Sequence, residues 1–280
     1  MTAPPSPQPA AASGTFVIGG DLPVHRLGFG AMRVTGNGVW GEPRNHDEAI
    51  AVLRRTLELG INFIDTADSY GPDVSERLIA EALHPYPRGL VIATKGGYLR
   101  PGPNRWKIHG PPAHLRAVCE GSLRRLKLER IDLYQLHRID PEVGVDAQLG
   151  ELKRLQEEGK IRHIGLSEVS VNDIVRARRI VPVVSVQNRY NIADRQWEPV
   201  VDYCTREGIA FIPWAPLISG SIGGWRNPLR RAAKETGATR AQVAIAWLLA
   251  RSPVLLPIPG TGSVKHLEEN AAAAALHLTP

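Results

Sequence analysis

Four ionisable side chains lie at or just after the ends of three apolar segments of the chain. Asp65 and Tyr70 belong to the stretch NFIDTADSYG (residues 62–71), Lys95 ends LVIATK, and His137 ends IDLYQLH. Burying an unpaired aspartate or lysine is costly, so we expect Asp65 and Lys95 to pair with each other. An ammonium beside a phenol lowers the phenol's pKa from about 10, which would make Tyr70 a tuned proton donor. With His137 bonded to a substrate oxygen, the four suit the reduction of a carbonyl group.

The elements that must position these side chains alternate regularly along the chain. Short apolar segments, predicted as strands, cover residues 26–32, 62–68, 90–95, 131–137, 163–168, 185–190, 209–216 and 255–260. Amphipathic segments, predicted as helices, cover residues 47–59, 75–83, 112–126, 146–158, 171–179, 196–207, 227–251 and 263–274. Eight strand–helix units in about 250 residues are what a closed (β/α)8 TIM barrel requires, with reactive groups at the C-terminal ends of its strands.

An open doubly wound sheet is the alternative architecture, and it predicts a dinucleotide fingerprint after the first strand. The nearest match, Gly28 and Gly30, has Arg33 in place of the third glycine, so the barrel is favoured. Before the barrel, TFVIGGDLPVHRL (residues 15–27) alternates around two glycines and predicts a β-hairpin. The Pro-, Ala- and Ser-rich residues 1–14 predict a disordered tail, which leaves residues 15–280 as one barrel domain.

The composition argues against several classes of function. The net charge of +6 permits an anionic ligand, but the basic residues are scattered, and RARR (residues 176–179) fits a solvated helix face better than a nucleic-acid surface. No run of about 18 apolar residues occurs, so no membrane association is expected. The two cysteines, Cys119 and Cys204, lack the spacing of metal ligands. We therefore expect no metal site, a cytoplasmic location, and a monomer or weak homo-oligomer.

Several motifs, in order along the chain, resemble those of the aldo-keto reductases. They are GINFIDTADSYG, the strand end at Lys95, LYQLH, HIGLSE, VQNRYN, PWAPL and IPGTGSVKHLEEN, and together they cover residues 16 to 278. Within that family the chain most resembles short bacterial reductases of the pyridoxal or pyridoxine branch. The resemblance implies NADPH-dependent reduction of an aldehyde or ketone to an alcohol, with NADH as an alternative cofactor. It makes Asp65, Tyr70, Lys95 and His137 a catalytic tetrad in which Tyr70 donates the proton.

The resemblance also implies where the cofactor binds along the rim of the barrel. Ser167 and Gln187 would hold the nicotinamide carboxamide, and Trp214 would stack on its ring where a tyrosine is more common. The start of the last helix would take the adenosine phosphate, as a helix N-terminus does on physical grounds alone. The complete set assigned to the cofactor is Ser167, Gln187, Trp214, Pro216, Leu217, Gly260, Thr261, Ser263, His266, Glu269 and Asn270.

Two departures from the family's pattern affect these expectations. Glu168 stands where asparagine is usual, and a carboxylate cannot donate to the carboxamide oxygen and would repel nearby anions. Gly260 and His266 stand where lysine and arginine are frequent at the 2′-phosphate site. We therefore expect a moderate preference for NADPH over NADH, with Lys265 or a loop arginine as compensation.

The substrate walls are expected in loops that follow the first, third and seventh strands. Trp40, Trp106 and Trp225 fall in these loops, beside Tyr98 and Arg138, and predict an aromatic pocket rather than ordinary loop packing.

Two other functions stay open at this point. One is a Schiff-base aldolase with Lys95 as nucleophile, although Asp65 would keep that amine protonated. The other is a non-catalytic NADPH sensor on the reductase fold, for which Glu168 is the main support.

Overall fold

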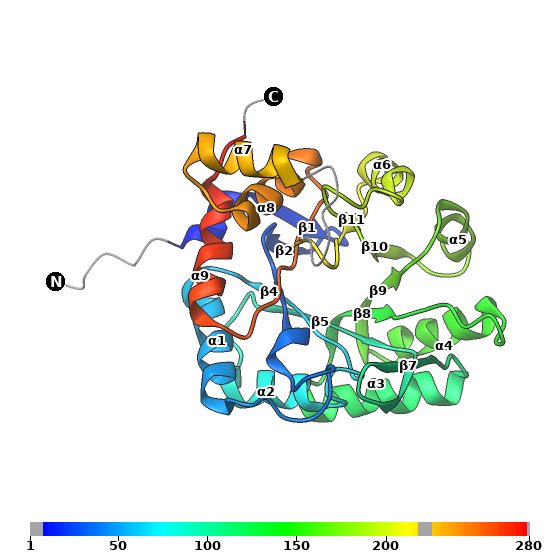
Figure 1. Ribbon diagram of the computed structural model, residues 1–280. Helices are drawn as coiled ribbons and strands as arrows, with labels where there is room; N and C mark the ends of the chain where they lie inside the picture. Colours follow the sequence, from blue (N-terminus) through cyan, green and yellow to red (C-terminus); the bar gives the residue numbers. More distant parts are fainter. Residues whose placement is uncertain (1–7, 218–225, 279–280) are drawn as a thin grey trace.

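The computed structural model describes residues 8–217 and 226–278, and its centre is a ring of parallel strands surrounded by helices (Figure 1). The ordered sheet runs β11-β10-β9-β8-β5-β4-β3, and neighbouring strands pair in parallel. These strands are β3 (Phe29–Gly30), β4 (Phe63–Asp65), β5 (Val91–Gly96), β8 (Ile131–Leu136), β9 (Ile161–Ser167), β10 (Val183–Gln187) and β11 (Ala210–Phe211). The predicted (β/α)8 barrel is confirmed.

The eighth segment of the barrel closes the ring without forming a regular strand. The backbone of Phe211 donates to Val254 at 2.9 Å and accepts from Leu256 at 2.8 Å, and Gly28 donates to Pro257 at 2.9 Å. Pro257 has no N–H to donate, and prolines also precede and follow this segment, so a continuous ladder cannot form. The strand predicted over residues 209–216 is therefore shortened to Ala210–Phe211, and the strand predicted over 255–260 is reduced to one isolated bridge between Phe211 and Leu255.

Gly30 serves this closure rather than a dinucleotide fingerprint. A Cβ atom at Gly30 would lie 2.7 Å from the carbonyl oxygen of Ile258, which real side chains do not tolerate. Only glycine lets the first strand and the closing segment approach this closely.

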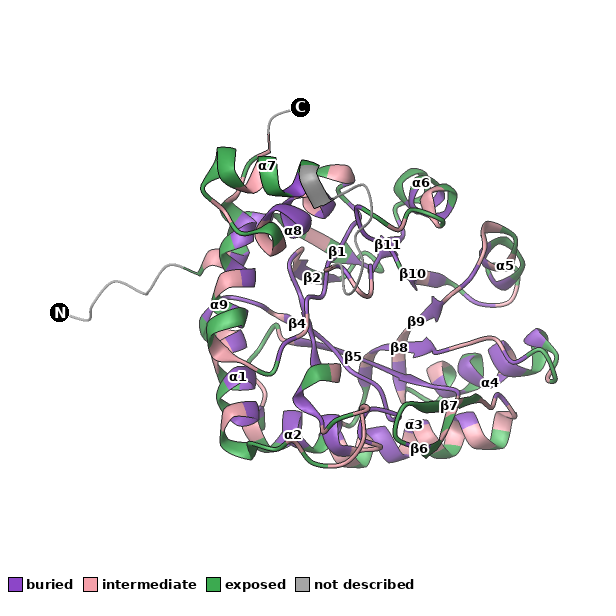
Figure 2. Ribbon diagram, in the orientation of Figure 1, coloured by how far each residue is buried: buried purple, intermediate pink, exposed green. Residues whose placement is uncertain are grey.

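Helices surround the ring, and their buried faces are turned toward the interior of the molecule (Figure 2). Their bounds are α1 (His46–Glu58), α2 (Val74–Leu83), α3 (Pro112–Leu126), α4 (Val145–Glu157), α5 (Val171–Ala177), α6 (Glu198–Glu207), α7 (Arg226–Thr236), α8 (Arg240–Arg251) and α9 (Val264–Ala272), followed by the short 3-10 helix η4 (Ala273–Ala275). The stretch over 227–251 was predicted as a split helical region, and it is divided into α7 and α8 because Gly237 adopts a positive φ of 66° and Thr239 then caps α8. A second 3-10 helix, η2 (Ala31–Val34), follows β3.

The predicted N-terminal hairpin is present and packs on the barrel core. Its strands β1 (Thr15–Ile18) and β2 (Leu22–His25) pair antiparallel. Ile18 and Val24 are buried in one apolar cluster with Phe63 and other barrel residues. The hairpin therefore extends the core of the barrel, because its inward side chains contact those of the strands.

The segment before the hairpin differs from the predicted disordered tail. Residues Pro9–Ser13 form a short 3-10 helix, η1, with Ala10 fully buried. The N–H of Ala10 donates to the carbonyl of Leu59 at 3.1 Å, and the Ser13 hydroxyl donates to the Ala10 carbonyl at 2.6 Å. The prediction is therefore wrong for this part of residues 1–14, because Ala10 is buried in an apolar cluster with Leu267 and Ala271 of α9 and η1 packs against α9 and η4. Residues 1–7 lie outside the described part of the chain.

A second hairpin follows β5 and was not predicted. Strands β6 (Tyr98–Gly102) and β7 (Arg105–Ile108) pair antiparallel in a sheet of their own. The turn between them contains Asn104 in a left-handed conformation, with φ at 55°. The apolar–polar alternation on both sides of the sequence PGPN was the signal that would have identified it.

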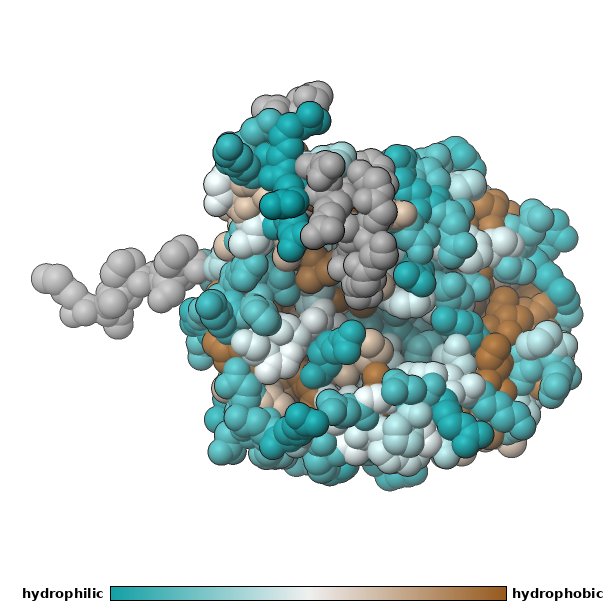
Figure 3. Space-filling view, viewed as in Figure 1, coloured by the Kyte–Doolittle hydropathy of each residue, from teal (hydrophilic) through white to brown (hydrophobic). Residues whose placement is uncertain are grey.

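Hydrophilic side chains cover most of the face seen in Figure 3. Within residues 8–217 and 226–278, no helix is both long enough and apolar enough to cross a membrane.

Candidate active site

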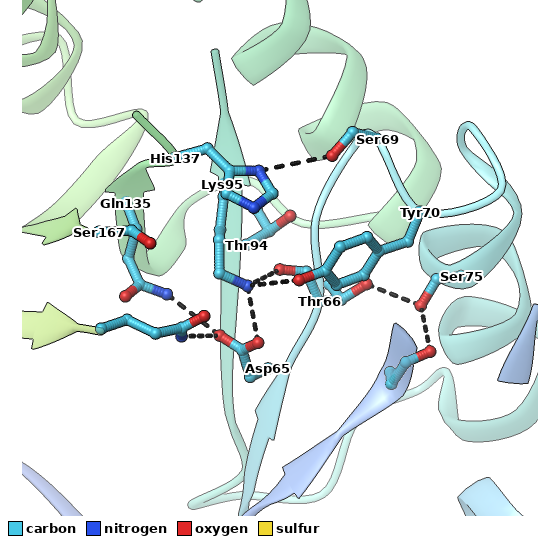
Figure 4. A network of polar contacts seen from close by, with 12 residues as sticks. Asp65, Thr66, Ser69, Tyr70, Ser75, Thr94, Lys95, Gln135, His137 and Ser167 are labelled. Atoms are coloured by element: carbon cyan, nitrogen blue, oxygen red, sulfur yellow. Dashed lines mark hydrogen bonds and ion pairs between the residues drawn. The ribbon is translucent and has the colours of Figure 1, made fainter. Parts of the chain in front are cut away.

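Lys95 and Asp65 form a buried ion pair at the C-terminal ends of neighbouring strands (Figure 4). The Lys95 ammonium donates to Asp65 Oδ2 at 2.6 Å, and the two side chains are 0% and 2% exposed. The same ammonium donates to the carbonyl of Thr66 at 2.7 Å and to the Tyr70 hydroxyl at 3.4 Å. The pairing predicted from the sequence is present because β4 and β5 are adjacent and end at the same rim.

The electrostatics of this pair determine the protonation of both Lys95 and Tyr70. Burial opposes the charge on Lys95, but Asp65 and Tyr70 outweigh it and raise the pKa of the ammonium. Burial also raises the pKa of the Tyr70 phenol, and Lys95 offsets only part of that effect. The predicted lowering of the Tyr70 pKa is therefore wrong here, because desolvation of the phenolate exceeds the attraction of the ammonium. At neutral pH, Tyr70 is protonated and Lys95 is charged.

His137 lies beside this pair, and Figure 4 shows its ring next to the Lys95 side chain. The ring centre is 5.9 Å from that of Tyr70, and Nδ1 lies 3.4 Å from the Ser69 hydroxyl oxygen. Burial lowers the pKa of His137 well below its ordinary value, and the charges of Lys95 and Arg138 add to this effect. His137 is therefore a neutral imidazole at neutral pH.

Two glutamines hold the other oxygen of Asp65. Gln135 and Gln187 donate to Asp65 Oδ1 at 3.1 and 2.8 Å. Gln135 is paired with Lys95 across β8 and β5, so both side chains lie on the inner face of the sheet. Gly165 on the next strand leaves room for it, since a Cβ there would lie 2.9 Å from Gln135 Cγ. Gln135 was not singled out from the sequence, although it stands two positions before His137, where a strand returns to the same face.

The β6–β7 hairpin brings aromatic side chains to the tetrad. The ring of Trp106 lies 6.2 Å from that of Tyr70 and 5.3 Å from that of Tyr98. Tyr98 in turn lies 4.6 Å from the ring of His137. The aromatic wall predicted around Trp106 therefore adjoins the proton-donor candidate. Trp225 lies outside the described residues.

Arg100 joins this hairpin to two other loops, and the sequence reading missed it. Its guanidinium carbon lies 3.6 Å from the centre of the Trp106 ring and 5.7 Å from that of Trp40. It also donates to the carbonyl of Ser69 at 2.5 Å and to that of Gly38 at 3.1 Å. One side chain thus connects the Trp106 hairpin, the Trp40 loop and the residue that precedes Tyr70.

The residues assigned to the nicotinamide lie at the ends of β9 and β10 and after β11. The Ser167 hydroxyl accepts a hydrogen bond from Arg138 at 3.0 Å. The indole N–H of Trp214 donates to Glu168 Oε1 at 2.6 Å. Pro216 is buried and Leu217 is half-buried, with Leu217 packed against an apolar cluster that includes Leu27 and Ile245. Ser167 and Gln187 are paired residues of β9 and β10, which places them side by side at the rim.

The residues assigned to the adenosine end gather at and within α9. Thr261 is nearly buried and accepts from the Ser263 N–H at 3.1 Å, while Asn270 is buried. Glu269 is half-buried, His266 is exposed, and Gly260 is partly exposed. Positions 260–270 thus form one continuous stretch that begins at the barrel rim.

Two charged residues near this stretch were not assigned to the cofactor. Glu48 of α1 accepts from the Val264 N–H at 3.0 Å, which places a carboxylate at the start of α9. Arg33 lies beside Gly260, since a Cβ on that glycine would be 3.6 Å from Arg33 Cγ. An arginine and a glutamate, with opposite effects on a phosphate group, therefore flank the helix start.

The chain belongs to the aldo/keto reductase family, whose sequence model matches residues 26–280 and so covers the whole of this barrel. It is 53% identical over 278 residues to the "Uncharacterized oxidoreductase C215.11c" of Schizosaccharomyces pombe, covering 99% of this chain and 90% of that protein. It is 43% identical over 274 residues to the pyridoxine 4-dehydrogenase of Escherichia coli, covering 96% of this chain and 95% of that protein.

Solved structures give the same result. The glycerol dehydrogenase AKR11B4 from Gluconobacter oxydans superimposes with a TM-score of 0.84 and 26% identity, covering 96% of this chain and 92% of that one. An aldo-keto reductase from Klebsiella pneumoniae in complex with NADPH gives a TM-score of 0.81 and 26% identity, covering 95% and 90%.

Proposed function

We propose that this chain is an NADPH-dependent reductase that converts an aldehyde or ketone to an alcohol, with Tyr70 as the proton donor. The observation that carries the proposal is the Tyr70 hydroxyl 3.4 Å from the ammonium of the buried Lys95–Asp65 pair. When bound, the nicotinamide supplies the hydride. The chain's own residues bind the carbonyl oxygen and supply the proton.

The proton step follows from the charges of the tetrad. Tyr70 is protonated at neutral pH and gives its proton to the carbonyl oxygen as negative charge develops there. The phenolate that remains lies beside the charged Lys95, which stabilises it in a site shielded from water. The neutral imidazole of His137 donates a hydrogen bond to the same oxygen and orients it, and Asp65 holds Lys95 in place.

The cofactor residues fit the two ends of a dinucleotide. Ser167 and Gln187 offer a hydroxyl and an amide to the carboxamide, and Trp214 offers a flat ring for the nicotinamide. Pro216 and Leu217 border this site. At the other end, the adenosine phosphate is held by Thr261, Ser263 and His266. The adenine is contacted by Glu269 and Asn270. NADH is the alternative cofactor, because Glu48 already places a carboxylate at the helix start.

Pyridoxal is the first substrate to test. The relative named pyridoxine 4-dehydrogenase is 43% identical over nearly the whole chain. The rings of Tyr98 and Trp106 beside Tyr70 and His137 are also suited to a flat heteroaromatic aldehyde.

Replacement of Tyr70 by phenylalanine tests the proposal. The loss of NADPH absorbance should be followed with a carbonyl panel that includes pyridoxal, and with NADH in parallel. We expect turnover to fall by roughly 100- to 10,000-fold, with NADPH binding and the melting temperature unchanged. Wild-type turnover in the Tyr70→Phe variant would refute the role of Tyr70.

The same experiments separate the two alternatives. Tight NADPH binding without turnover over the whole panel would indicate the non-catalytic sensor. A covalent adduct trapped by borohydride would indicate the Schiff-base aldolase, which the charged state of Lys95 argues against.

A further inference from the structure

Glu168 and Trp214 are joined by a hydrogen bond at the rim that the proposed reaction does not use. Oε1 of Glu168 accepts from the Trp214 indole N–H at 2.6 Å and from the backbone N–H of Arg189 at 2.6 Å. The Arg189 guanidinium carbon lies 5.7 Å from the Trp214 ring centre. The indole is therefore held from its edge by a carboxylate and adjoined by a cation.

The backbone directs the Glu168 side chain into this position. Glu168 adopts φ of 56°, in the left-handed region that non-glycine residues seldom occupy. Its own N–H donates to the carbonyl of Gln187 at 3.0 Å, which continues the β9–β10 pairing for one more residue. The strained turn thus sends the carboxylate across β10 toward the loop after β11, where Trp214 lies.

We propose that Glu168 is a positioning residue that fixes the Trp214 ring as the surface on which the nicotinamide packs. This rests on the proposed function, because it takes Trp214 as the nicotinamide contact. A tryptophan side chain has two free torsions, and a charge-assisted hydrogen bond to its edge selects one orientation of the ring. The cofactor then meets a ring that is already ordered, so less entropy is lost when the nicotinamide binds.

The geometry also answers the expectation that this carboxylate weakens nicotinamide binding by repulsion. Two N–H groups, one from an indole and one from the backbone, bind Oε1 and neutralise part of its charge. Positioning and repulsion predict opposite changes in NADPH affinity for a variant that lacks the Glu168 carboxylate. Removal of the carboxylate weakens NADPH binding if Glu168 positions Trp214, and strengthens it if Glu168 repels the cofactor.

A double-mutant cycle on NADPH affinity tests the proposal, with Kd measured by fluorescence titration. Glu168→Ala should weaken binding by about tenfold, whereas Glu168→Gln, which keeps an acceptor oxygen, should stay within about threefold of wild type. Trp214→Phe keeps a flat ring but has no N–H, so adding Glu168→Ala to it should change Kd by less than about twofold.

Two controls make the result specific. Adenosine 2′,5′-bisphosphate, which lacks the nicotinamide, should bind equally to wild type and to Glu168→Ala, because Glu168 follows β9, whereas the residues assigned to the adenosine end lie at α9, with β10, β11 and the closing segment between them in the ring. The indole N–H signal that disappears from the ¹H–¹⁵N spectrum in Trp214→Phe should shift in Glu168→Ala.

Each outcome is informative. Unchanged or tighter NADPH binding in Glu168→Ala, or additive effects in the cycle, would overturn the proposal. If Trp214→Ala leaves NADPH affinity unchanged, the placement of the nicotinamide in the proposed function is wrong instead. If Trp214→Ala weakens binding but Glu168→Ala does not, that placement stands and only the role of Glu168 fails.

Discussion

Replacement of Lys95 by methionine should destabilise the protein even without cofactor or substrate. The change removes a cation that is 0% exposed and leaves the Asp65 carboxylate buried. Breaking a buried ion pair in this way typically costs about 3–5 kcal/mol. Two amide donors, Gln135 and Gln187, remain on Asp65, so we place the expected loss near about 3 kcal/mol.

The double variant Asp65→Asn/Lys95→Met identifies the origin of that loss. The amide oxygen of asparagine still accepts from the two glutamines, and no charge remains buried. We therefore expect the double variant to recover about half of the lost free energy of unfolding.

Urea unfolding followed by circular dichroism measures these free energies. Lys160→Met is the matched control, because Lys160 pairs with Glu120 and Glu158 at 2.8 and 2.7 Å but lies at the surface. It should cause a much smaller loss. A Lys95→Met variant as stable as Lys160→Met, or a double variant less stable than the single one, would refute the view that the unpaired charge causes the effect.

Three further predictions concern the site. The kcat/KM for carbonyl reduction should stay level between about pH 5.5 and about pH 8, since His137 is neutral there, and should fall only above about pH 10 as Tyr70 loses its proton. A break near pH 6.5 in a pH–rate series would contradict the argument that burial keeps His137 neutral. Glu48→Gln should tighten NADPH binding about threefold and leave NADH binding unchanged in a fluorescence titration, because the variant removes a carboxylate from the start of α9. Equal effects on the two cofactors would place Glu48 away from the 2′-phosphate. Arg100→Leu should raise KM for aromatic aldehydes about tenfold with a smaller change in kcat, because Trp106 loses its stacked cation and the carbonyls of Ser69 and Gly38 lose their shared hydrogen-bond donor. With Arg100→Lys as the control, an unchanged KM in Arg100→Leu would show that the hairpin holds its position without the arginine.

The parts of the fold that could be predicted are those with strong local patterns. The helix over residues 112–126 has the bounds expected from its apolar spacing, and the parallel strands before Lys95 and His137 were found from their apolar runs. The closing segment was harder to predict, because its prolines lack the N–H groups that a strand donates, although carbonyls such as that of Pro257 still accept hydrogen bonds from neighbouring strands. The β6–β7 hairpin was missed because its strands are only five and four residues long and, being largely exposed, lack the apolar run that marks a buried strand.

The site shows a similar division. The meeting of Asp65, Tyr70, Lys95 and His137 follows from strand order, which the alternation of elements determines. The direction of the Tyr70 pKa shift could not be predicted from the sequence, because it depends on how completely neighbouring side chains exclude water from the phenol. Arg100 and Glu48 act through contacts between residues more than 30 positions apart, such as Arg100 with Ser69, and no local pattern reveals such pairs.

The β6–β7 hairpin shares no ladder with the barrel, since its two strands form a separate sheet. Insertions or substitutions in this hairpin therefore do not interrupt the pairing of the parallel strands that carry Asp65 and Lys95. Under the proposed function, selection on substrate choice can act on residues 98–108 while the buried Lys95–Asp65 pair stays in place. After gene duplication, copies of such an enzyme can diverge in what they reduce without first losing the ability to reduce anything.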